Sequence, residues 1–205
     1  MPFSYSKLDF LKATENTNYF LDANIWLKIL NPKVKASHKD KVYRNFFDSI
    51  ISNSKSKIVL PSLVLSEVIN RILREVHMGK YIAKKKQLDP SFKEDSGFYK
   101  SVFRKTEDFR IAYNLVCDEI KNYHSSISLI NDGLGSEFKF KHILKDPPSG
   151  LDFNDYYYYN ICKKKGYVLI TDDKDFWVED VMILTQSDTL YNRYISLKVE
   201  ANSNQ

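Results

Sequence analysis

The sequence predicts an α/β fold with a central, mainly parallel sheet flanked by helices. Short apolar runs of strand length alternate with segments in which apolar residues recur at helical spacing. Most of these runs lead directly into a helical segment, an order typical of parallel strands joined by crossover helices. The chain has 205 residues, 43% of them hydrophobic, which is enough for one domain with its own core.

Five segments have the pattern of buried strands. Each is a short apolar run bounded by polar or turn-forming residues, and the third is the weakest of them. The predicted strands are residues 19–22, 57–60, 126–130, 167–171 and 181–185.

Helical spacing of apolar residues predicts helices between the strands. They cover residues 23–30, 40–52, a segment opened by Pro61 and Ser62, 99–124 and 156–165. Asn154 or Asp155 is expected to open the last helix, and Gly166 to end it, because glycine readily takes the left-handed conformation that closes a helix. A polar tail is expected after residue 185.

The middle of the chain differs in composition from the rest. From about residue 79 to residue 149 it is rich in lysine, with three in succession at 84–86, and Pro90 interrupts the pattern. We therefore expect a single domain over residues 1–205, in which this central segment is a mainly helical insertion.

Charge and cysteine content indicate the class of partner and the compartment. The formal charge is 31 − 26 = +5 and the pI is about 8.9, which favours phosphate-bearing partners such as RNA. Two cysteines are too few for a disulfide framework, so a reducing, cytoplasmic location is expected. No uncharged apolar stretch approaches the roughly 20 residues that span a bilayer, so no membrane partner is expected.

Two common enzyme classes lack their motifs. The sequence contains no Gly-x-Ser-x-Gly turn of a Ser/His/Asp hydrolase and no glycine-rich nucleotide loop. The four histidines show no metal-ligand spacing either. Any metal site would therefore depend on carboxylates.

Four acids occupy positions where strands meet helices. Asp22 ends the first predicted strand, Glu67 lies on the helix after the second, Asp155 lies at a helix start, and Asp173 follows the fourth strand. In open α/β sheets the carboxyl ends of the strands border the ligand crevice. Acids gathered there repel one another, and Mg²⁺ or Mn²⁺, which prefer carboxylate oxygens, would neutralise them.

Each acid also has an ordinary structural interpretation. Asp22 and Asp155 could cap helices, Glu67 could be a solvated helix residue, and Asp173 could belong to a merely acidic turn. No single acid decides between the two interpretations. The functional prediction therefore depends on the four acids together.

The acids lie within four short motifs that occur in order. These are Leu-Asp-x-Asn at 21–24, Ser-Glu-x-x-Asn at 66–70, an aspartate at a helix start at 155, and Ile-Thr-x-Asp-x-Asp-Phe at 170–176. The ordered set resembles the PIN-domain ribonucleases, in particular the toxin-type, VapC-like members.

The resemblance covers residues 19–78 and 150–185, and the segment between them is longer than in the small toxins. The interval between the last two acids, 173 − 155 = 18 residues, is similar to the usual one in the family. It favours Asp155 over Asp152 as the third acid, and Asp173 over its acidic neighbours as the fourth.

The resemblance implies a PIN-like three-layer sandwich and a Mg²⁺- or Mn²⁺-dependent endoribonuclease that hydrolyses RNA phosphodiester bonds. It implies that four acids are both catalytic and metal-binding: Asp22, Glu67, Asp155 and Asp173. Four neighbours would orient them: Asn24, Thr171, Asp152 and Asp175.

Basic and aromatic residues near these motifs are candidates for contact with RNA. The basic candidates follow Glu67 and are Arg71, Arg74, Lys84, Lys85 and Lys86, which equally fit a solvated basic face. The tyrosines at 156–159 could stack on unpaired bases, or they could simply form helix surface and core.

The resemblance also raises two partners that the sequence does not establish. They are a cognate antitoxin, if the chain is the toxin of a toxin–antitoxin pair, and a second copy of the chain in a homodimer. Two other functions stay open: a non-catalytic PIN-like module that binds RNA or protein, and a DNA-directed nuclease of the same fold. The presence of all four acids argues against the first, and the modest size of the chain argues against the second.

Overall fold

The described residues of the chain form one parallel sheet of six strands with helices around it. A computed structural model describes residues 3–9, 11–30, 36–130 and 150–203. The strands are β1 (Ser4–Lys7), β2 (Asn18–Leu21), β3 (Lys57–Pro61), β4 (Ile127–Ile130), β5 (Val168–Ile170) and β6 (Met182–Thr185). Their order is β1-β6-β5-β2-β3-β4, and every pair is parallel. This confirms the predicted fold class.

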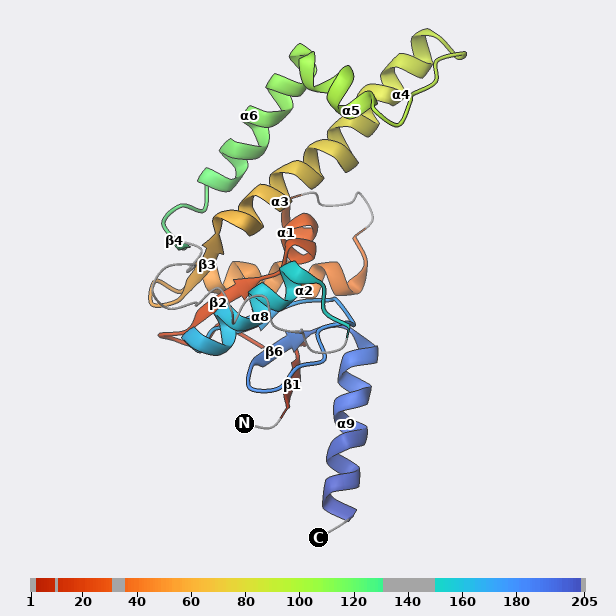
Figure 1. The fold of residues 1–205 in the computed structure, drawn as a ribbon. Coiled ribbons are helices and arrows are strands. Elements are labelled where there is room, and N and C mark those ends of the chain that lie inside the picture. Colours follow the sequence, from red (N-terminus) through yellow and green to blue (C-terminus); the bar gives the residue numbers. More distant parts are fainter. Residues whose placement is uncertain (1–2, 10, 31–35, 131–149, 204–205) are drawn as a thin grey trace.

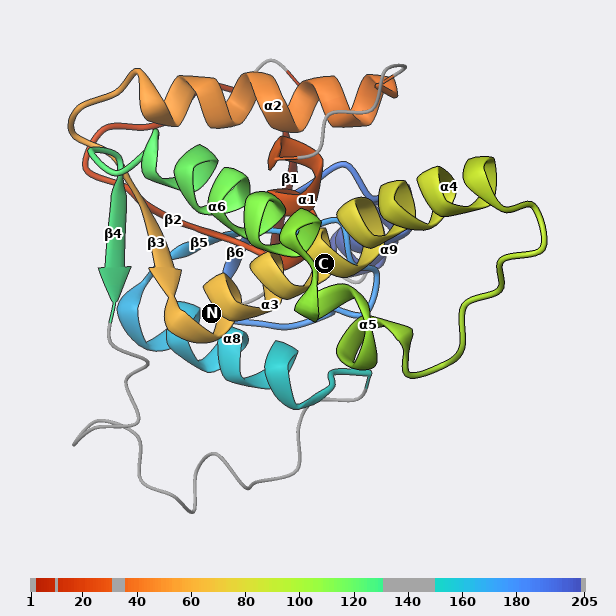
Figure 2. The same ribbon diagram turned by 90° about the horizontal axis from the view of Figure 1, so that it is seen from above.

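Helices lie on both faces of the sheet, which gives three layers. They include α1 (Ala23–Leu30), α2 (His38–Ile51), α3 (Ser62–Ile72) and α8 (Phe153–Lys165). Seen from above, α2 lies along one side of the strands and α8 along the other (Figure 2). Phe20, Leu169 and Ile183 on the inner strands are fully buried, because a parallel sheet covered on both faces exposes almost none of its central side chains.

The order of the strands places a switch point between β2 and β5, where a ligand crevice is expected. From β2 the chain moves outward through β3 to β4, and it then returns to the other side of β2 through β5 and β6. The connections after β2 and β5 therefore leave the sheet in opposite directions. Such a switch point is where open α/β sheets place their ligands.

A helical arm extends from the sheet (Figure 1). Helix α3 continues through a single π-helical turn, η1 (Leu73–His77), into α4 (Met78–Leu88). The chain then passes through α5 (Phe98–Ser101) and a short 3-10 turn, η2 (Phe103–Lys105), and returns along α6 (Glu107–Lys121), which contacts α3 and η1. Among the described residues, none of these helices is long and apolar enough to cross a membrane.

The single helix predicted over residues 99–124 is wrong, because the chain turns before α6 begins. Thr106 has an extended backbone, and its hydroxyl accepts a hydrogen bond from the backbone N–H of Phe109 at 3.1 Å. This is an N-cap, which satisfies an amide that the first turn of a helix leaves free. The apolar spacing continues across the turn, and for this reason the sequence pattern does not reveal it.

Both ends of the chain carry elements that the sequence did not predict. Ser4–Lys7 forms β1 at the edge of the sheet, and Asp188–Ser203 forms helix α9 in place of the predicted polar tail. Helix α9 contacts β1, and its Leu190 and Tyr194 are buried. Tertiary contacts between the two ends therefore stabilise elements whose own sequences are mostly polar.

The expected boundaries of the insertion stay a prediction. Its expected start at residue 79 falls inside the continuous helix formed by α3, η1 and α4, and β4 from the same segment pairs with β3. Residues 131–149 of the segment lie outside the described residues.

We predict that Tyr5→Phe in β1 lowers the free energy of unfolding by about 1–3 kcal/mol, because it leaves a buried N–H without a partner. The buried Tyr5 hydroxyl accepts a hydrogen bond from the N–H of Val178 at 2.8 Å and lies 2.9 Å from the carbonyl oxygen of Phe176. Urea unfolding would measure the change. The control is Tyr113→Phe on α6, whose side chain is 44% exposed; equal stability of the two variants would contradict the prediction.

Candidate active site

Asp22 lies at the carboxyl end of β2, at the switch point of the sheet. Its N–H donates to the carbonyl oxygen of Ile170 at 3.0 Å, and its own carbonyl accepts from the N–H of Ile25 at 2.9 Å, which starts α1. The side-chain carboxylate does not take part in these backbone contacts. It accepts hydrogen bonds from Thr171 Oγ1 at 2.9 Å and from Asn24 Nδ2 at 3.3 Å. The side chain is therefore held by two neutral donors, Asn24 and Thr171.

Thr171 also fixes the turn that carries Asp173. Its hydroxyl oxygen accepts a hydrogen bond from the N–H of Asp173 at 3.0 Å, and a carboxylate oxygen of Asp173 accepts from the N–H of Asp175 at 2.9 Å. One threonine thus links the carboxylate of Asp22 to the backbone of Asp173. In this contact Asp175 donates through its backbone N–H, whereas the sequence suggested a role for its carboxylate.

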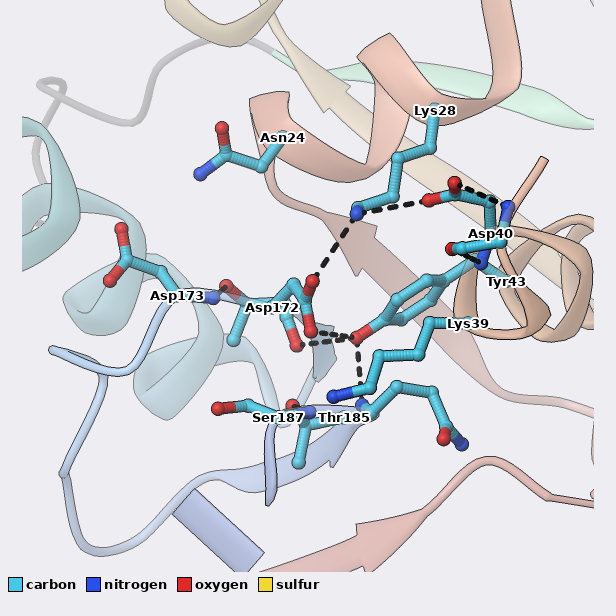
Figure 3. A network of polar contacts seen from close by, with 12 residues as sticks. Asn24, Lys28, Lys39, Asp40, Tyr43, Asp172, Asp173, Thr185 and Ser187 are labelled. Carbon is cyan, nitrogen blue, oxygen red and sulfur yellow. Dashed lines mark hydrogen bonds and ion pairs between the residues drawn. The ribbon is translucent and has the colours of Figure 1, made fainter. Parts of the chain in front are cut away.

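Asp172, the neighbour of Asp173, belongs to a different network. Its carboxylate lies 2.9 Å from the hydroxyl of Tyr43 and 3.2 Å from Nζ of Lys28. Figure 3 shows the side chain of Asp172 directed toward Tyr43 and Lys28, while that of Asp173 points away from them. The two adjacent aspartates therefore have separate environments.

Asp155 is not the cap of α8, because Asp152 takes that position. A carboxylate oxygen of Asp152 accepts a hydrogen bond from the N–H of Asp155 at 2.9 Å, and the helix begins at Phe153. The expectation that Asn154 or Asp155 opens the helix is therefore wrong. Since Asp152 satisfies the free amide, the side chain of Asp155 does not serve as the N-cap.

Glu67 lies on α3 and is contacted by a tyrosine of α8. The hydroxyl of Tyr158 donates to Glu67 Oε2 at 3.0 Å, and Nη1 of Arg71 lies 3.9 Å from Oε1. Tyr158 is almost completely buried. This contact could not be predicted from the sequence, because nothing in a run of four tyrosines indicates which one contacts the acid.

The four tyrosines of α8 are buried side chains, so their proposed role in stacking on bases is wrong. Tyr156, Tyr157, Tyr158 and Tyr159 are each at most 8% exposed. They therefore form part of the core, the other interpretation of the run.

The pKa values indicate that the four acids lie within electrostatic reach of one another. Burial raises the pKa of Asp22 to about 6, and the charges of Asp173 and Glu67 raise it further, against the hydrogen bonds from Thr171 and Asn24. Burial also raises the pKa of Asp155 to about 7, with added repulsion from Asp152 and the three other acids of the set. Thus the acids predicted from the sequence converge in one region, and each disfavours ionisation of its neighbours.

The acids form an open arrangement. Within the part of the chain that the structure describes, no three acidic, histidine or cysteine side chains are close enough to hold an ion as they stand. A ligand at the site would therefore need small side-chain movements.

The basic candidates divide into one residue beside the acids and others farther along the arm. Arg71 donates to Asn24 Oδ1 and to Glu75 Oε1, both at 2.9 Å. Arg74 lies over the ring of Tyr99. Lys84 is 84 − 67 = 17 residues beyond Glu67 on a nearly continuous helix, or about 25 Å at 1.5 Å per residue.

Lys84 and its two neighbours therefore cannot contact the same phosphate as the acids. Lys85 lies over the ring of Tyr81, and Lys86 forms an ion pair with Glu94 at 3.1 Å. Any contact of these lysines with RNA would be with a flanking part of the strand.

The raised pKa values predict how the stability of the metal-free protein depends on pH. A carboxyl group whose pKa is higher in the folded state than in the unfolded state favours folding most below its unfolded pKa of about 4. This contribution is lost as the pH rises through about 6 for Asp22 and about 7 for Asp155.

Asp155→Asn should therefore raise the melting temperature at pH 8 in a chelator, and the gain over wild type should shrink toward pH 4. Differential scanning calorimetry across this pH range would measure it. The matched control is Asp118→Asn, an exposed acid of α6 paired with Lys121. A constant difference between Asp155→Asn and wild type at all pH values would contradict the raised pKa.

The fold agrees with the family comparison. The family model described as PIN domain matches residues 19–178. No curated protein sequence matches the chain significantly.

Two solved structures are similar to the chain at low identity. The crystal structure of VapBC2 from Rickettsia felis bound to a DNA fragment from their promoter has 14% identity and a TM-score of 0.43, over 82% of this chain and 98% of that one. The crystal structure of PAE2754 from Pyrobaculum aerophilum has 18% identity and a TM-score of 0.40, over 93% of this chain and 97% of that one. Because the family match covers most of the sequence, from β2 to the turn before β6, the chain belongs to the PIN domain family.

Proposed function

We propose that the chain is a Mg²⁺- or Mn²⁺-dependent endoribonuclease that hydrolyses RNA phosphodiester bonds. The observation that carries the proposal is the convergence of four carboxylates from four elements at the switch point of the sheet, where burial and mutual repulsion raise the pKa of Asp22 to about 6 and that of Asp155 to about 7. A protein accepts such crowding at a functional site more readily than elsewhere.

The donor set suits a hard divalent cation. Asp22, Glu67, Asp155 and Asp173 would hold it, since carboxylate oxygens are the ligands that Mg²⁺ and Mn²⁺ prefer. Asp22 is buried, and its two hydrogen-bond donors are both neutral, so a cation would supply the missing positive charge. When bound, the cation would lower the pKa of a water molecule and neutralise charge on the phosphodiester oxygens.

Other residues of the chain would keep the acids in place. Thr171 and Asn24 hold the carboxylate of Asp22, and the hydroxyl of Tyr158 holds that of Glu67. Because each of these donors is neutral, none of them competes with a cation for the charge of the acids. Their role would be to orient the carboxylates before a cation binds.

The toxin role, the cognate antitoxin, the homodimer and the cytoplasmic location expected from the sequence remain proposals. The first two follow from the likeness of the motifs to toxin-type family members. An antitoxin would inhibit the enzyme most simply by covering the crevice between β2 and β5.

We predict that the wild type cleaves single-stranded or hairpin RNA in the presence of Mg²⁺ or Mn²⁺, and that Asp22→Asn and Asp173→Asn lose the activity. The expected loss of activity exceeds about 100-fold, because replacing a residue that only orients a metal ligand already lowers metal affinity or activity by about 10- to 100-fold. Gel assays with matched RNA and DNA substrates would measure it, with circular dichroism to confirm folding.

The control for this assay is Asp118→Asn, which removes an exposed acid of α6 and should leave the rate unchanged. Cleavage of DNA alone would replace the proposal by a DNA nuclease. Binding of RNA without any cleavage by the metal-loaded wild type would favour the non-catalytic module.

We also predict that replacing Lys84, Lys85 and Lys86 together by alanine weakens RNA binding and flattens its dependence on salt. Loss of three contacts to single-stranded RNA would lower the slope of log K against log salt by about 2. Fluorescence anisotropy in a chelator would measure binding without cleavage. An unchanged slope would show that these lysines are not part of the RNA-binding surface. Lys55→Ala, in the turn before β3, serves as a control.

A further inference from the structure

A pocket of about 630 Å³ opens directly beside the acids. Its walls come from α1, α2, η1 and the turn after β5, and Asn24 and Asp173 line it. Since Asp173 is one of the four acids and Asn24 donates to the carboxylate of Asp22, the pocket reaches the acids. Figure 3 shows Asn24 and Asp173 beside the network of Lys28, Asp40, Tyr43 and Asp172.

Two of the cations that line the pocket are already used by the fold. Lys28 lies between Asp40, at 3.1 Å, and Asp172, at 3.2 Å. Arg44 donates to the carbonyl oxygens of Lys28 and Ile29 at the end of α1. Both cations therefore already have partners within the fold.

Two other lysines are available at the pocket. Lys41 of α2 and Lys174 of the turn after β5 both line it and are exposed, and neither forms an ion pair with another residue that the structure describes. They come from different elements on two sides of the pocket. A phosphate group of a ligand could therefore be held at its opening.

The remaining lining favours a nucleobase over a bare phosphate. Leu27 and Val76 provide apolar surface, and the carboxylates of Asp40, Asp172 and Glu75 lie among the cations. Each of these carboxylates already pairs with Lys28 or Arg71, but a carboxylate can accept several hydrogen bonds and so can also accept one from a base. A phosphate site would be lined by donors alone, whereas the edge of a base carries donors and acceptors and its faces are apolar. The volume lies within the range of ordinary small-molecule sites.

We propose that this pocket receives one unpaired nucleotide of the RNA, next to the bond that is cleaved. The base packs against Leu27 and Val76, and its phosphate lies toward Lys41 and Lys174. The inference rests on the proposed nuclease function and deepens it. The enzyme would then require an unpaired base beside the cut, and the pocket would be the place where it selects that base.

The test compares the affinity of a fluorescein-labelled single-stranded RNA octamer with that of an abasic octamer of the same ribose-phosphate backbone. Anisotropy is measured with Ca²⁺ in place of Mg²⁺, and a gel confirms that the RNA stays intact. The wild type should bind the RNA about tenfold more tightly than the abasic strand, as expected for one base packed in a pocket.

Val76→Trp and Leu27→Trp fill the pocket from two different walls, and each should reduce this preference to less than about twofold while binding of the abasic strand changes little. Two variants are used so that misfolding of one leaves the other to decide. The matched control, Val102→Trp on the arm, should keep the tenfold preference. Lys41→Ala combined with Lys174→Ala should weaken binding of both strands by the same factor.

The inference is overturned if the wild type binds both strands equally, or if both filled variants fold and keep the preference. A pocket that serves a protein segment instead would give the first of these results. Mn²⁺-dependent cleavage by the wild type, assayed separately, distinguishes failure of this inference from failure of the proposed function. Cleavage without a base preference would rule out only the proposed role of the pocket. A base preference without cleavage would rule out only the proposed nuclease function.

Discussion

The repulsion among four carboxylates at the switch point is the constraint on which the rest of the site depends. Burial and mutual charge disfavour ionisation of Asp22 and Asp155, yet no cation of the chain reaches the carboxylate of Asp22 by any contact among the described residues. Neutral hydrogen bonds from Thr171, Asn24 and Tyr158 hold the set instead. A protein that needed these acids only for stability would gain more from pairing them with lysine or arginine.

Arg71 lies 3.9 Å from Glu67, whereas the contacts of Lys28 keep it away from Asp22 and Asp173. Lys28 is held by Asp40 and Asp172. Asp172 directly precedes Asp173 in the sequence, but the two side chains point in different directions. Tyr43 completes this arrangement, because its hydroxyl contacts Asp172 and accepts the N–H of Gln186 at 2.7 Å. The network thus anchors the turn after β5 to α2 and to the end of β6, and the side chain of Asp173 points away from it (Figure 3).

Much of the fold could be predicted from the sequence, and so could the positions of two candidate acids after strands, because apolar strands that are followed by acids leave a local pattern. Asp22 and Asp173 are examples. The strand β1 and the helix α9 could not be predicted, since their formation depends on contacts with each other and with β6 rather than on their own composition. The cap at Asp152 and the contact of Tyr158 with Glu67 were also missed. The cap depends on where the helix begins, and the contact depends on which of four tyrosines faces Glu67, and neither choice leaves a pattern in the sequence.

The most direct test of the account is calorimetric titration of Mn²⁺ into the metal-free protein at about pH 6.5, in buffers of different ionisation enthalpy. Because the pKa of Asp22 is about 6 and that of Asp155 about 7, both are partly protonated at this pH, so metal binding should release protons. We expect the wild type to bind Mn²⁺ with release of protons, and Asp22→Asn to bind Mn²⁺ much more weakly. Absence of Mn²⁺ binding to the folded wild type, or equal affinity of the variant, would contradict the assignment of these carboxylates as a metal site.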